Sequence, residues 1–355
     1  MNPKPTEPSW NRLTRWLLAL CAQETTSGRE DAGLPALRAI LDELGADVHI
    51  QPVAEGRSNV LALWGQPKVL FSTHLDTVPP YFPPRAEGEI LHGRGSCDAK
   101  GQIVAQLAAI ADLLVGGHRD IAWLGVVGEE TDSAGAAASL ALAPRFSACK
   151  ALIIGEPTGL KLATGQRGVQ HFVLRSRGKA AHSSTPEAGA SALWPLLDWL
   201  QQLRELPRPS DPELGPEIWN LGLLQGGEAV NMVPDFAQAH VHARVLPGSD
   251  LEACIHRLRP PQGEVERRLS EPPDRYPRLP DFEHAAMPFG SDAPQMRDLI
   301  PDRTVVLAGP GSIGFAHTTQ ERITLPELEG GVELNRRLAL YFLGLDPDDI
   351  PTQPI

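Results

Sequence analysis

Short apolar runs of β-strand composition alternate with segments of helical period along the first half of the chain. The runs are VHIQPV, NVLALWG, KVLFSTHLD, IAWLGVVG and KALIIGEP. Between them, apolar residues recur at helical spacing over residues 34–44 and 102–115, and the small-residue segment SAGAAASLALA predicts a further helix. Strands that alternate with helices form a mostly parallel sheet in layered domains, so the sequence predicts an α/β fold.

The pattern changes near Arg167. VQHFVLRSRG alternates like a half-buried strand, residues 192–200 have helical spacing, IWNLGLLQGG and AQAHVHARVLP predict two more strands, and DLEACIHRL predicts a second helix. The order β-α-β-β-α-β is ferredoxin-like. After a proline-rich stretch the chain is α/β again and ends in a predicted helix near residues 325–342. We therefore expect a discontinuous larger domain, residues 1–166 and 281–355, interrupted by a smaller inserted domain, residues 167–280.

Charge and cysteine content exclude several classes of protein. The 355 residues include 44 acidic and 32 basic side chains, a net charge of −12. Nucleic acids and anionic membranes attract basic surfaces, so we expect neither as a partner. No apolar run reaches the ~18 residues of a membrane span. Four cysteines without a CxxC pair predict neither a disulfide framework nor a thiolate zinc site, and they fit the reducing cytoplasm.

The segment WLLALCA, residues 16–22, follows two arginines and has a weak likeness to a signal peptide. Its apolar core is as short as such a core can be, and no small-x-small cleavage site follows it. Leu13, Trp16, Leu17 and Leu20 instead recur at helical spacing. We therefore predict an amphipathic first helix.

Acidic and histidine side chains stand at the ends of predicted strands and in nearby turns, where open α/β sheets bind their ligands. They are His74, Asp76, Asp98, Glu129, Glu130, Glu156 and His317. Each alone is explained as a solvated or core residue, but so many carboxylates at one edge need a cation to neutralise them. Imidazole mixed with carboxylate suits zinc, with cobalt or manganese as substitutes. Two ions about 3.5–4 Å apart share a ligand, and we expect Asp98 to be this bridging ligand. Cys97, next to it, is expected to be a packing residue and not a ligand.

Two pairs of neighbours in this set predict a division of labour. His74 and Asp76 lie two residues apart on a strand, so both point the same way and the carboxylate can fix the tautomer of the imidazole. Of the adjacent Glu129 and Glu130, one can bind metal while the other accepts a proton from water.

The strings STHLDTVP, GRGSCDAKG, GEE, GEPT and AHTTQE occur in this order. Together they resemble the M20 metallopeptidase family, which contains acetylornithine deacetylase, succinyl-diaminopimelate desuccinylase, aminoacylase and carboxypeptidase G. The resemblance extends from about Trp10 to Leu343. It implies an aminopeptidase-like catalytic domain with a mixed central sheet and two zinc ions per subunit, interrupted by a ferredoxin-like dimerisation domain.

The resemblance also implies a role for each residue of the metal centre. His74 and Glu156 would bind one zinc ion, Glu130 and His317 the other, and Asp98 both. Asp76 would orient His74, and Glu129 would be the general base and acid of amide hydrolysis.

In the inserted domain, GKAAHSSTPEAGASA resembles the family segment whose histidine reaches the active site of the partner subunit and stabilises the oxyanion, which implies this role for His182. The family usually has glycine where Ala181 stands. Substrate contacts are implied at Arg167, Asn231, Arg244 and Gly311. His242 stands where the family often has an acidic residue.

The segments LATGQRGVQHF and GPGSIGFAHTTQERITLPEL resemble the acetylornithine and acetylcitrulline deacetylase branch. We therefore expect a cytoplasmic homodimer that removes the acetyl group from N-acetylornithine in arginine biosynthesis. An acetylcitrulline or acyl-lysine deacylase, the desuccinylase, and a dipeptidase or carboxypeptidase are the alternatives. A metal-binding relative without turnover is disfavoured, because such a protein has no need of Glu129.

Two other motifs carry less weight. GPGSIG fits the dinucleotide pattern GxGxxG, but no apolar helix follows it, as that fingerprint requires. No GxSxG nucleophile elbow is present, because Pro310 precedes Gly311 in PGSIG, and this disfavours a serine hydrolase.

Overall fold

A computed structural model describes residues 11–346, and the chain divides into two units. The first unit is Met1–Ala163, Tyr276–Ala285 and Ser291–Ile355, and the second is Thr164–Arg275 and Ala286–Gly290. The outer ends of the expected larger domain, residues 1–10 and 347–355, lie outside the described residues. Residues 276–280, expected in the insertion, belong to the first unit, where Leu279 joins the hydrophobic core.

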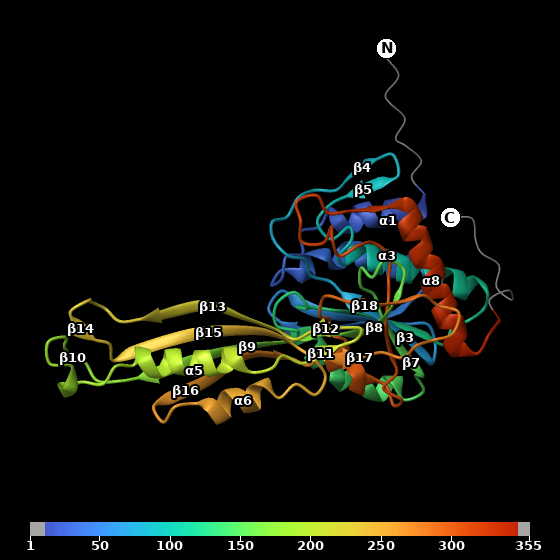
Figure 1. Cartoon of the computed structure of the whole chain (residues 1–355). Helices are drawn as coiled ribbons and strands as arrows, with labels where there is room; N and C mark the ends of the chain where they lie inside the picture. The colour runs from blue at the N-terminus through green and yellow to red at the C-terminus, as the bar shows by residue number, and fades with distance from the viewer. Residues whose placement is uncertain (1–10, 347–355) are drawn as a thin grey trace, which may run out of the picture. The chain divides into compact units, whose positions relative to one another are not determined.

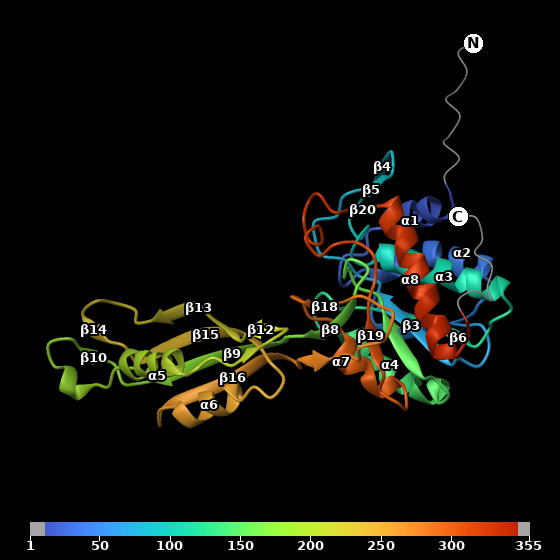
Figure 2. The same cartoon turned by 45° about the vertical axis from the view of Figure 1, so that its right-hand side comes forward.

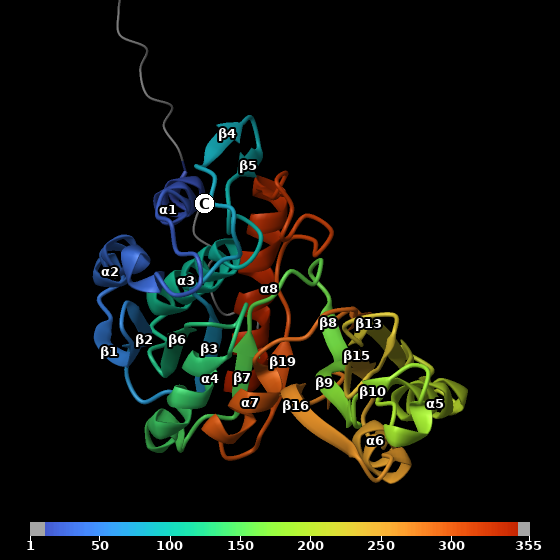
Figure 3. The same ribbon diagram turned by 90° about the vertical axis from the view of Figure 1, so that its left-hand side faces the viewer.

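The first unit is built on a mixed six-stranded sheet (Figure 3). In spatial order its strands are β1 (Asp47–Ala54), β2 (Arg57–Leu63), β6 (Ile121–Val126), β3 (Val69–His74), β7 (Ala151–Ile154) and β19 (Val305–Leu307). The first two pairings are antiparallel, and the pairings from β6 to β19 are parallel. Every residue of β3, β6, β7 and β19 is buried, as expected for parallel strands covered on both faces.

Helices cover both faces of this sheet (Figure 3). They are α1 (Arg12–Cys21), α2 (Leu34–Glu43), α3 (Lys100–Val115), α4 (Ala134–Ser139), α7 (Ala293–Met296) and α8 (Leu325–Leu343). The amphipathic helix α1 is confirmed: the Asn11 side chain caps its start and Leu13, Trp16, Leu17 and Leu20 are buried. In α8, the Thr324 and Glu327 side chains form a capping box.

The helix predicted over SAGAAASLALA is only partly correct. An α-helix forms over Ala134–Ser139, and residues Leu140–Phe146 continue as the 3₁₀-helix η2. Pro144 lies within this second stretch. Proline lacks a backbone N–H and clashes with the carbonyl four residues before it, so the α-helix does not continue through it.

A small antiparallel sheet lies apart from the central one (Figure 2). Its order is β20 (Arg322–Thr324), β5 (Ile90–His92) and β4 (Arg85–Glu87). Short 3₁₀-helices η1 (Glu30–Gly33) and η4 (Arg297–Leu299) complete this unit. Among residues 11–346, no helix combines the length and apolarity needed to cross a bilayer.

The second unit has the β-α-β-β-α-β order expected from the sequence (Figure 1). The elements are β9 (Gly168–Arg177), α5 (Leu193–Glu205), β13 (Ile218–Gly226), β15 (Phe236–Val245), α6 (Leu251–Leu258) and β16 (Gly263–Glu271). The antiparallel sheet has the order β13-β15-β9-β16, so β13 is an edge strand. Alternate residues of β15 from Ala237 to Val245 are buried with α5 and α6 in one core.

Shorter strands complete the fold. They are β8 (Leu162–Gln166), β10 (Ala181–His182), β11 (Ser210–Asp211), β12 (Gly215–Pro216), β14 (Met232–Val233), β17 (Asp274–Arg275) and β18 (His284–Met287), with the one-turn 3₁₀-helix η3 (Pro186–Ala188). The pairs are β10 with β14 and β11 with β12, and β8 lies between β17 and β18.

Candidate metal centre

The carboxyl ends of three adjacent strands position most of the predicted metal ligands. His74 is the last residue of β3, Glu129 and Glu130 follow β6, and Glu156 follows β7. Parallel strands present these ends at one edge of the sheet, where open α/β sheets place their sites. Two loops of the same unit add Asp98, just before α3, and His317, between β19 and β20.

These five ligand candidates form two groups that share Asp98. His74, Asp98 and Glu156 bring ligand atoms within 4.8 Å of one another, and so do Asp98, Glu130 and His317. His74 Nε2 lies 2.9 Å from Asp98 Oδ1, whereas His317 Nε2 lies 3.3 Å from Asp98 Oδ2 and 2.9 Å from Glu130 Oε1. Each carboxylate oxygen of Asp98 therefore faces a different histidine.

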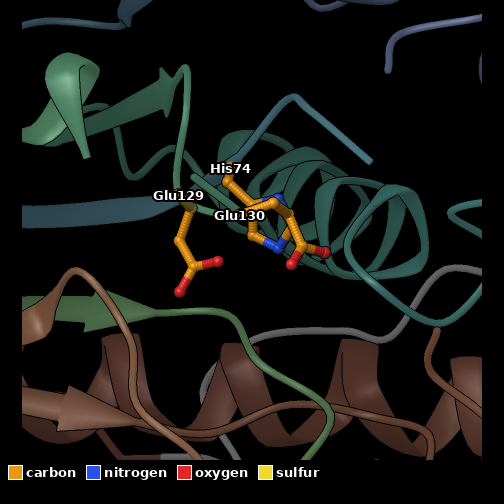
Figure 4. Close-up of side chains that lie close together, drawn as sticks. All are labelled: His74, Glu129 and Glu130. Carbon is orange, nitrogen blue, oxygen red and sulfur yellow. The ribbon is translucent and has the colours of Figure 1, made fainter. Parts of the chain in front are cut away.

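Glu129 takes a different position in this cluster. It groups with His74 and Glu130 but belongs to neither of the groups that share Asp98. Figure 4 shows the side chains of His74, Glu129 and Glu130 lying close together. Burial raises the pKa of Glu129 well above its usual range, and the nearby Glu156 carboxylate adds to the rise. Its environment thus favours the protonated form.

The other groups show that the cluster attracts positive charge. Burial alone would raise the pKa of Asp98, but hydrogen bonds from His317 and His74 outweigh burial and lower it. The hydrogen bonds to Asp98 and Glu130 raise the pKa of His317 to about 10. The carboxylates stabilise the positive charge of this imidazole. A dication would be stabilised by the same carboxylates, and its binding would release the proton from the imidazole.

Asp76 holds this site together through its backbone and its carboxylate. The Nδ1 atom of His74 lies 3.0 Å from the carbonyl oxygen of Asp76, which can only accept, so Nδ1 carries a proton and Nε2 is the nitrogen that a metal could bind in place of its proton. The carboxylate accepts hydrogen bonds from the Ser27 hydroxyl and from the backbone N–H groups of Gly128, Glu129 and Glu130. The sequence analysis expected the carboxylate beside the imidazole, and Oδ1 lies 3.4 Å from Nδ1. The carbonyl contact and the support of the glutamate loop were not anticipated.

Ser27 was missed by the sequence analysis. Its hydroxyl donates to Asp76 Oδ2 at 2.7 Å from a position 49 residues earlier in the chain. A serine in a turn before the first strand carries no pattern that would single it out.

Cys97, expected to pack, is buried, and its Sγ lies 3.5 Å from the carbonyl oxygen of Ser312.

The remaining predicted residues are divided between the units. Gly311 lies in the first unit with φ near +80°. His182 is exposed on β10 of the second unit, and its Nδ1 accepts the backbone N–H of Ser184 at 3.2 Å. Asn231 precedes β14, and its carbonyl accepts the Ser183 N–H. Arg244 lies on β15, on the sheet face opposite the helices, and Arg167 donates to the Pro216 carbonyl.

The residues present fit a pair of divalent ions. Both imidazoles expose Nε2 to carboxylates, and the donor set of two imidazoles and three carboxylates suits a metal such as zinc. Buried carboxylates that approach one another need a counter-charge, and the ion pairs that Asp98 and Glu130 make with described residues are to His74 and His317. The arrangement can bind two cations through Asp98 and leave Glu129 free.

Comparison with known proteins agrees with this chemistry. The model of peptidase family M20/M25/M40 matches residues 70–341. Peptidase M20 domain-containing protein C757.05c of Schizosaccharomyces pombe is 32% identical over 95% of this chain and 86% of its own length. A probable carboxypeptidase of Aspergillus terreus is 36% identical over 80% of this chain and 74% of its own length.

The same fold is found in a solved structure, aminopeptidase PepT from Bacillus cereus. It superimposes with a TM-score of 0.75 at 20% identity, covering 94% of this chain and 98% of that one. The family match, the relatives and the donor set at the strand ends agree with one another. The chain therefore belongs to peptidase family M20/M25/M40 and is a metal-dependent hydrolase of amide bonds.

Proposed function

We propose that this chain cleaves the amide bond next to a C-terminal amino acid in small substrates, either short peptides or N-acyl amino acids. The observation that carries the proposal is the position of Asp98, whose two carboxylate oxygens face two different histidines. A carboxylate placed in this way is suited to join two metal ions.

In this proposal four of the predicted ligands would hold one ion each and Asp98 would hold both. His74 and Glu156 would bind one ion, and Glu130 and His317 would bind the other. We propose zinc as the native metal, with cobalt or manganese as substitutes, because the donors are imidazole and carboxylate. When bound, a dication pair lowers the pKa of water and polarises the amide carbonyl.

Glu129 is the proposed general base and acid. Its carboxyl lies in reach of the ligand cluster but outside both groups that share Asp98. Burial, and then the nearby Glu156 carboxylate, raise its pKa, so Glu129 binds a proton more readily than an exposed glutamate does. It can therefore take a proton from the attacking water and return it to the leaving amine. Asp76 supports this role, because its carboxylate holds the backbone N–H of Glu129.

Residues of the second unit are proposed to bind the substrate. Because Nδ1 of His182 accepts the Ser184 N–H, the neutral imidazole carries its proton on Nε2, which is then free to donate to an oxyanion. Arg244 has the planar, charged fork that binds carboxylates in two-pronged fashion. Arg167, Asn231 and, from the first unit, Gly311 complete the proposed contacts.

We propose that the chain forms a homodimer through its second unit. The edge strand β13 exposes Leu221, Leu223 and Leu224, and α5 exposes Trp194, which is 70% exposed. A groove of about 870 Å³ runs between these elements, and Leu197 lines it together with Leu221 and Leu224. An unpaired edge strand flanked by apolar side chains is suited to pair with a second copy.

The relatives favour a peptidase over the deacetylase expected from the sequence. The Aspergillus relative carries the name carboxypeptidase. None of the three proteins with which the chain was compared, from Schizosaccharomyces pombe, Aspergillus terreus and Bacillus cereus, carries the name acetylornithine deacetylase. N-acetylornithine stays in the proposal as one member of the N-acyl amino acid class. The four cysteines are all buried and free, in accord with the proposed cytoplasmic location.

A release assay tests the proposal. Purified protein, stripped with chelator and reloaded with zinc or cobalt, is offered dipeptides, N-acetylornithine, N-acetylcitrulline and N-succinyl-diaminopimelate. We expect hydrolysis of at least one dipeptide or N-acyl amino acid, loss of activity on chelation and recovery on reloading. Absence of turnover on the whole panel in the reloaded protein would contradict the proposal.

A further inference from the structure

A buried carboxylate stands directly behind the bridging Asp98. Glu321 is 1% exposed, and its Oε1 accepts the backbone N–H groups of Gly95, Cys97 and Asp98 at 3.1, 3.1 and 3.0 Å. Its Oε2 pairs with Nη1 of Arg94 at 2.5 Å. One side chain therefore engages four donors from five consecutive residues, 94–98.

The turn that carries Asp98 is shaped to surround this carboxylate. Gly95 has φ near +87°, and a Cβ there would lie 2.8 Å from the Lys100 side chain and 2.9 Å from that of Thr77. Consecutive N–H groups that converge on one point in a turn with a left-handed residue form an anion-binding concavity. Arg94 is fully buried, so removing its partner would leave an unpaired charge inside the protein.

Glu321 also belongs to the loop of the second predicted ligand, His317. It lies four residues after His317 and directly before β20, which pairs with β5 through Arg322 and His92. The backbone carbonyl of Glu321 also accepts the N–H of Gly93. The two loops that bring Asp98 and His317 together are thus joined through one residue.

We propose that Glu321 is a positioning residue of the metal centre: it fixes the backbone of Asp98 so that the two carboxylate oxygens face His74 and His317. This inference rests on the proposed function, in which Asp98 joins two ions. Metal sites tolerate ligand displacements of only about 0.5 Å, and the groups behind the ligands set that precision. Glu321 holds Asp98 through a hydrogen bond from the Asp98 backbone N–H, and it holds the preceding turn through Arg94, Gly95 and Cys97.

A purely structural role would predict a loss of stability without a specific loss of metal affinity. The chain offers a matched control in Asp112, a buried carboxylate of α3 that pairs with Arg12 at 3.3 Å in the same unit. Neither Asp112 nor Arg12 belongs to a potential ligand group. Glu321→Gln and Asp112→Asn therefore remove comparable carboxylates, of which only the first lies behind the metal centre.

The test measures zinc affinity and stoichiometry of the full chain, stripped of metal, by competition with a chromophoric chelator. Glu321→Gln is expected to weaken zinc binding about 10–100-fold, the usual effect of removing a group behind a ligand. Asp112→Asn is expected to bind zinc like the wild type, although both variants lower the thermal unfolding midpoint.

Asp98→Asn separates the two hypotheses. If it weakens zinc binding while Glu321→Gln binds like the wild type, the positioning role is wrong and the proposed function stands. If Asp98→Asn itself keeps wild-type affinity and stoichiometry, the proposed function fails. Should Glu321→Gln not fold, Glu321→Asp keeps the charge that pairs with Arg94, but its side chain is one methylene shorter and cannot hold the three N–H groups in the same geometry. Zinc affinity weakened several-fold in that variant supports the inference, and unchanged affinity overturns it.

Discussion

At the scale of single residues, two residues of this site, Asp98 and Asp76, each contact two different partners. Asp98 meets a different histidine with each oxygen, and Asp76 binds His74 through its carbonyl and the glutamate loop through its carboxylate. A smaller side chain, or one that can contact only one of the two neighbours, would lose part of these contacts. Glu129 differs, because it belongs to neither group around Asp98, and its proposed role as a base can therefore be tested separately from the proposed ligands.

Glu129→Gln should retain bound zinc and lose turnover. The amide keeps the size of the side chain but cannot accept a proton, and a general base typically contributes about 10²–10⁴-fold to the rate. We expect a fall of that order in kcat with a metal content equal to the wild type, measured by elemental analysis and by peptide release. Loss of metal in Glu129→Gln, with retention in Glu130→Gln, would mean that the roles of the two glutamates are reversed.

At the scale of elements, the strands could be predicted, because a fully buried parallel strand contains a run of apolar residues, and the candidate ligands were sought where such runs end. His74 is the last residue of β3, and Glu156 follows β7 after Gly155. The loop contacts could not be predicted in this way. Glu321 meets Asp98 across 223 residues of sequence, and the N–H groups that Asp76 holds belong to a neighbouring strand's loop. Local spacing carries no record of such pairings.

Gly311 gives a prediction about one of these loops. Its φ near +80° disfavours any other residue, and a Cβ there would lie 2.6 Å from the Sγ of Cys97, next to Asp98. Gly311→Ala should therefore lower the free energy of unfolding by more than the ~1–3 kcal/mol of left-handed strain alone, and should weaken zinc binding. Gly88→Ala is the matched control, because Gly88 has φ near +61° and no atom within 4 Å of its Cβ position. The free energy of unfolding of both variants is measured by chemical denaturation. Equal losses would contradict the prediction, because they would mean that the contact with Cys97 costs no stability.

The sheet of the second unit should be sensitive to acid. His171 Nε2 lies 3.1 Å from His240 Nδ1, and its pKa is lowered by burial first and then by His240, His242 and Arg268, with Glu266 opposing. A histidine that binds its proton less readily in the folded chain contributes stability above its ordinary pKa of about 6.5, and this contribution is lost as the pH falls below that value.

His171→Gln should flatten this dependence. We expect the urea midpoint of the wild type to fall between pH 7.5 and 5.5 by more than that of the variant. His49→Gln, in the first unit, serves as the control and should follow the wild type. An identical pH dependence in wild type and His171→Gln would contradict the assignment.

At the scale of the whole molecule, the candidate metal ligands and the proposed dimer surface belong to different units. All predicted metal ligands lie in the first unit, whereas the exposed leucines of β13 and Trp194 lie in the second. The insertion could be predicted from the change in strand and helix order. The roles of His182 and Arg244 came only from the family resemblance, because side chains outside a buried core leave no periodic pattern. The net charge of −12 did not indicate the cation-binding site either, since the acidic cluster is a small share of the 44 acidic residues.

Leu221→Glu should convert the proposed homodimer into monomers. Leu221 is 48% exposed on the edge strand and lines the groove beside α5, so a carboxylate there would be desolvated in a dimer. Leu140→Glu introduces the same charge at a leucine that is 38% exposed in the first unit, and should leave the mass unchanged. Analytical ultracentrifugation measures the mass of each variant. If the wild type sediments as a monomer, the proposed homodimer is wrong.

The dimer gives the sharpest test of His182, because its proposed target is the active site of the other chain. His182→Ala should slow hydrolysis without changing metal content, since the residue belongs to no ligand group and lies in the unit without metal ligands. In a hybrid of a Glu129→Gln chain with a His182→Ala chain, one site combines an intact Glu129 with the His182 of the opposite chain. Mixing the two impaired variants under conditions of subunit exchange should therefore raise the activity above that of either variant alone. If His182 acted within its own chain, every site of the hybrid would lack one of the two groups and mixing would restore nothing. Repeating the mixture with Leu221→Glu added to both chains should abolish the recovery, because the chains no longer associate.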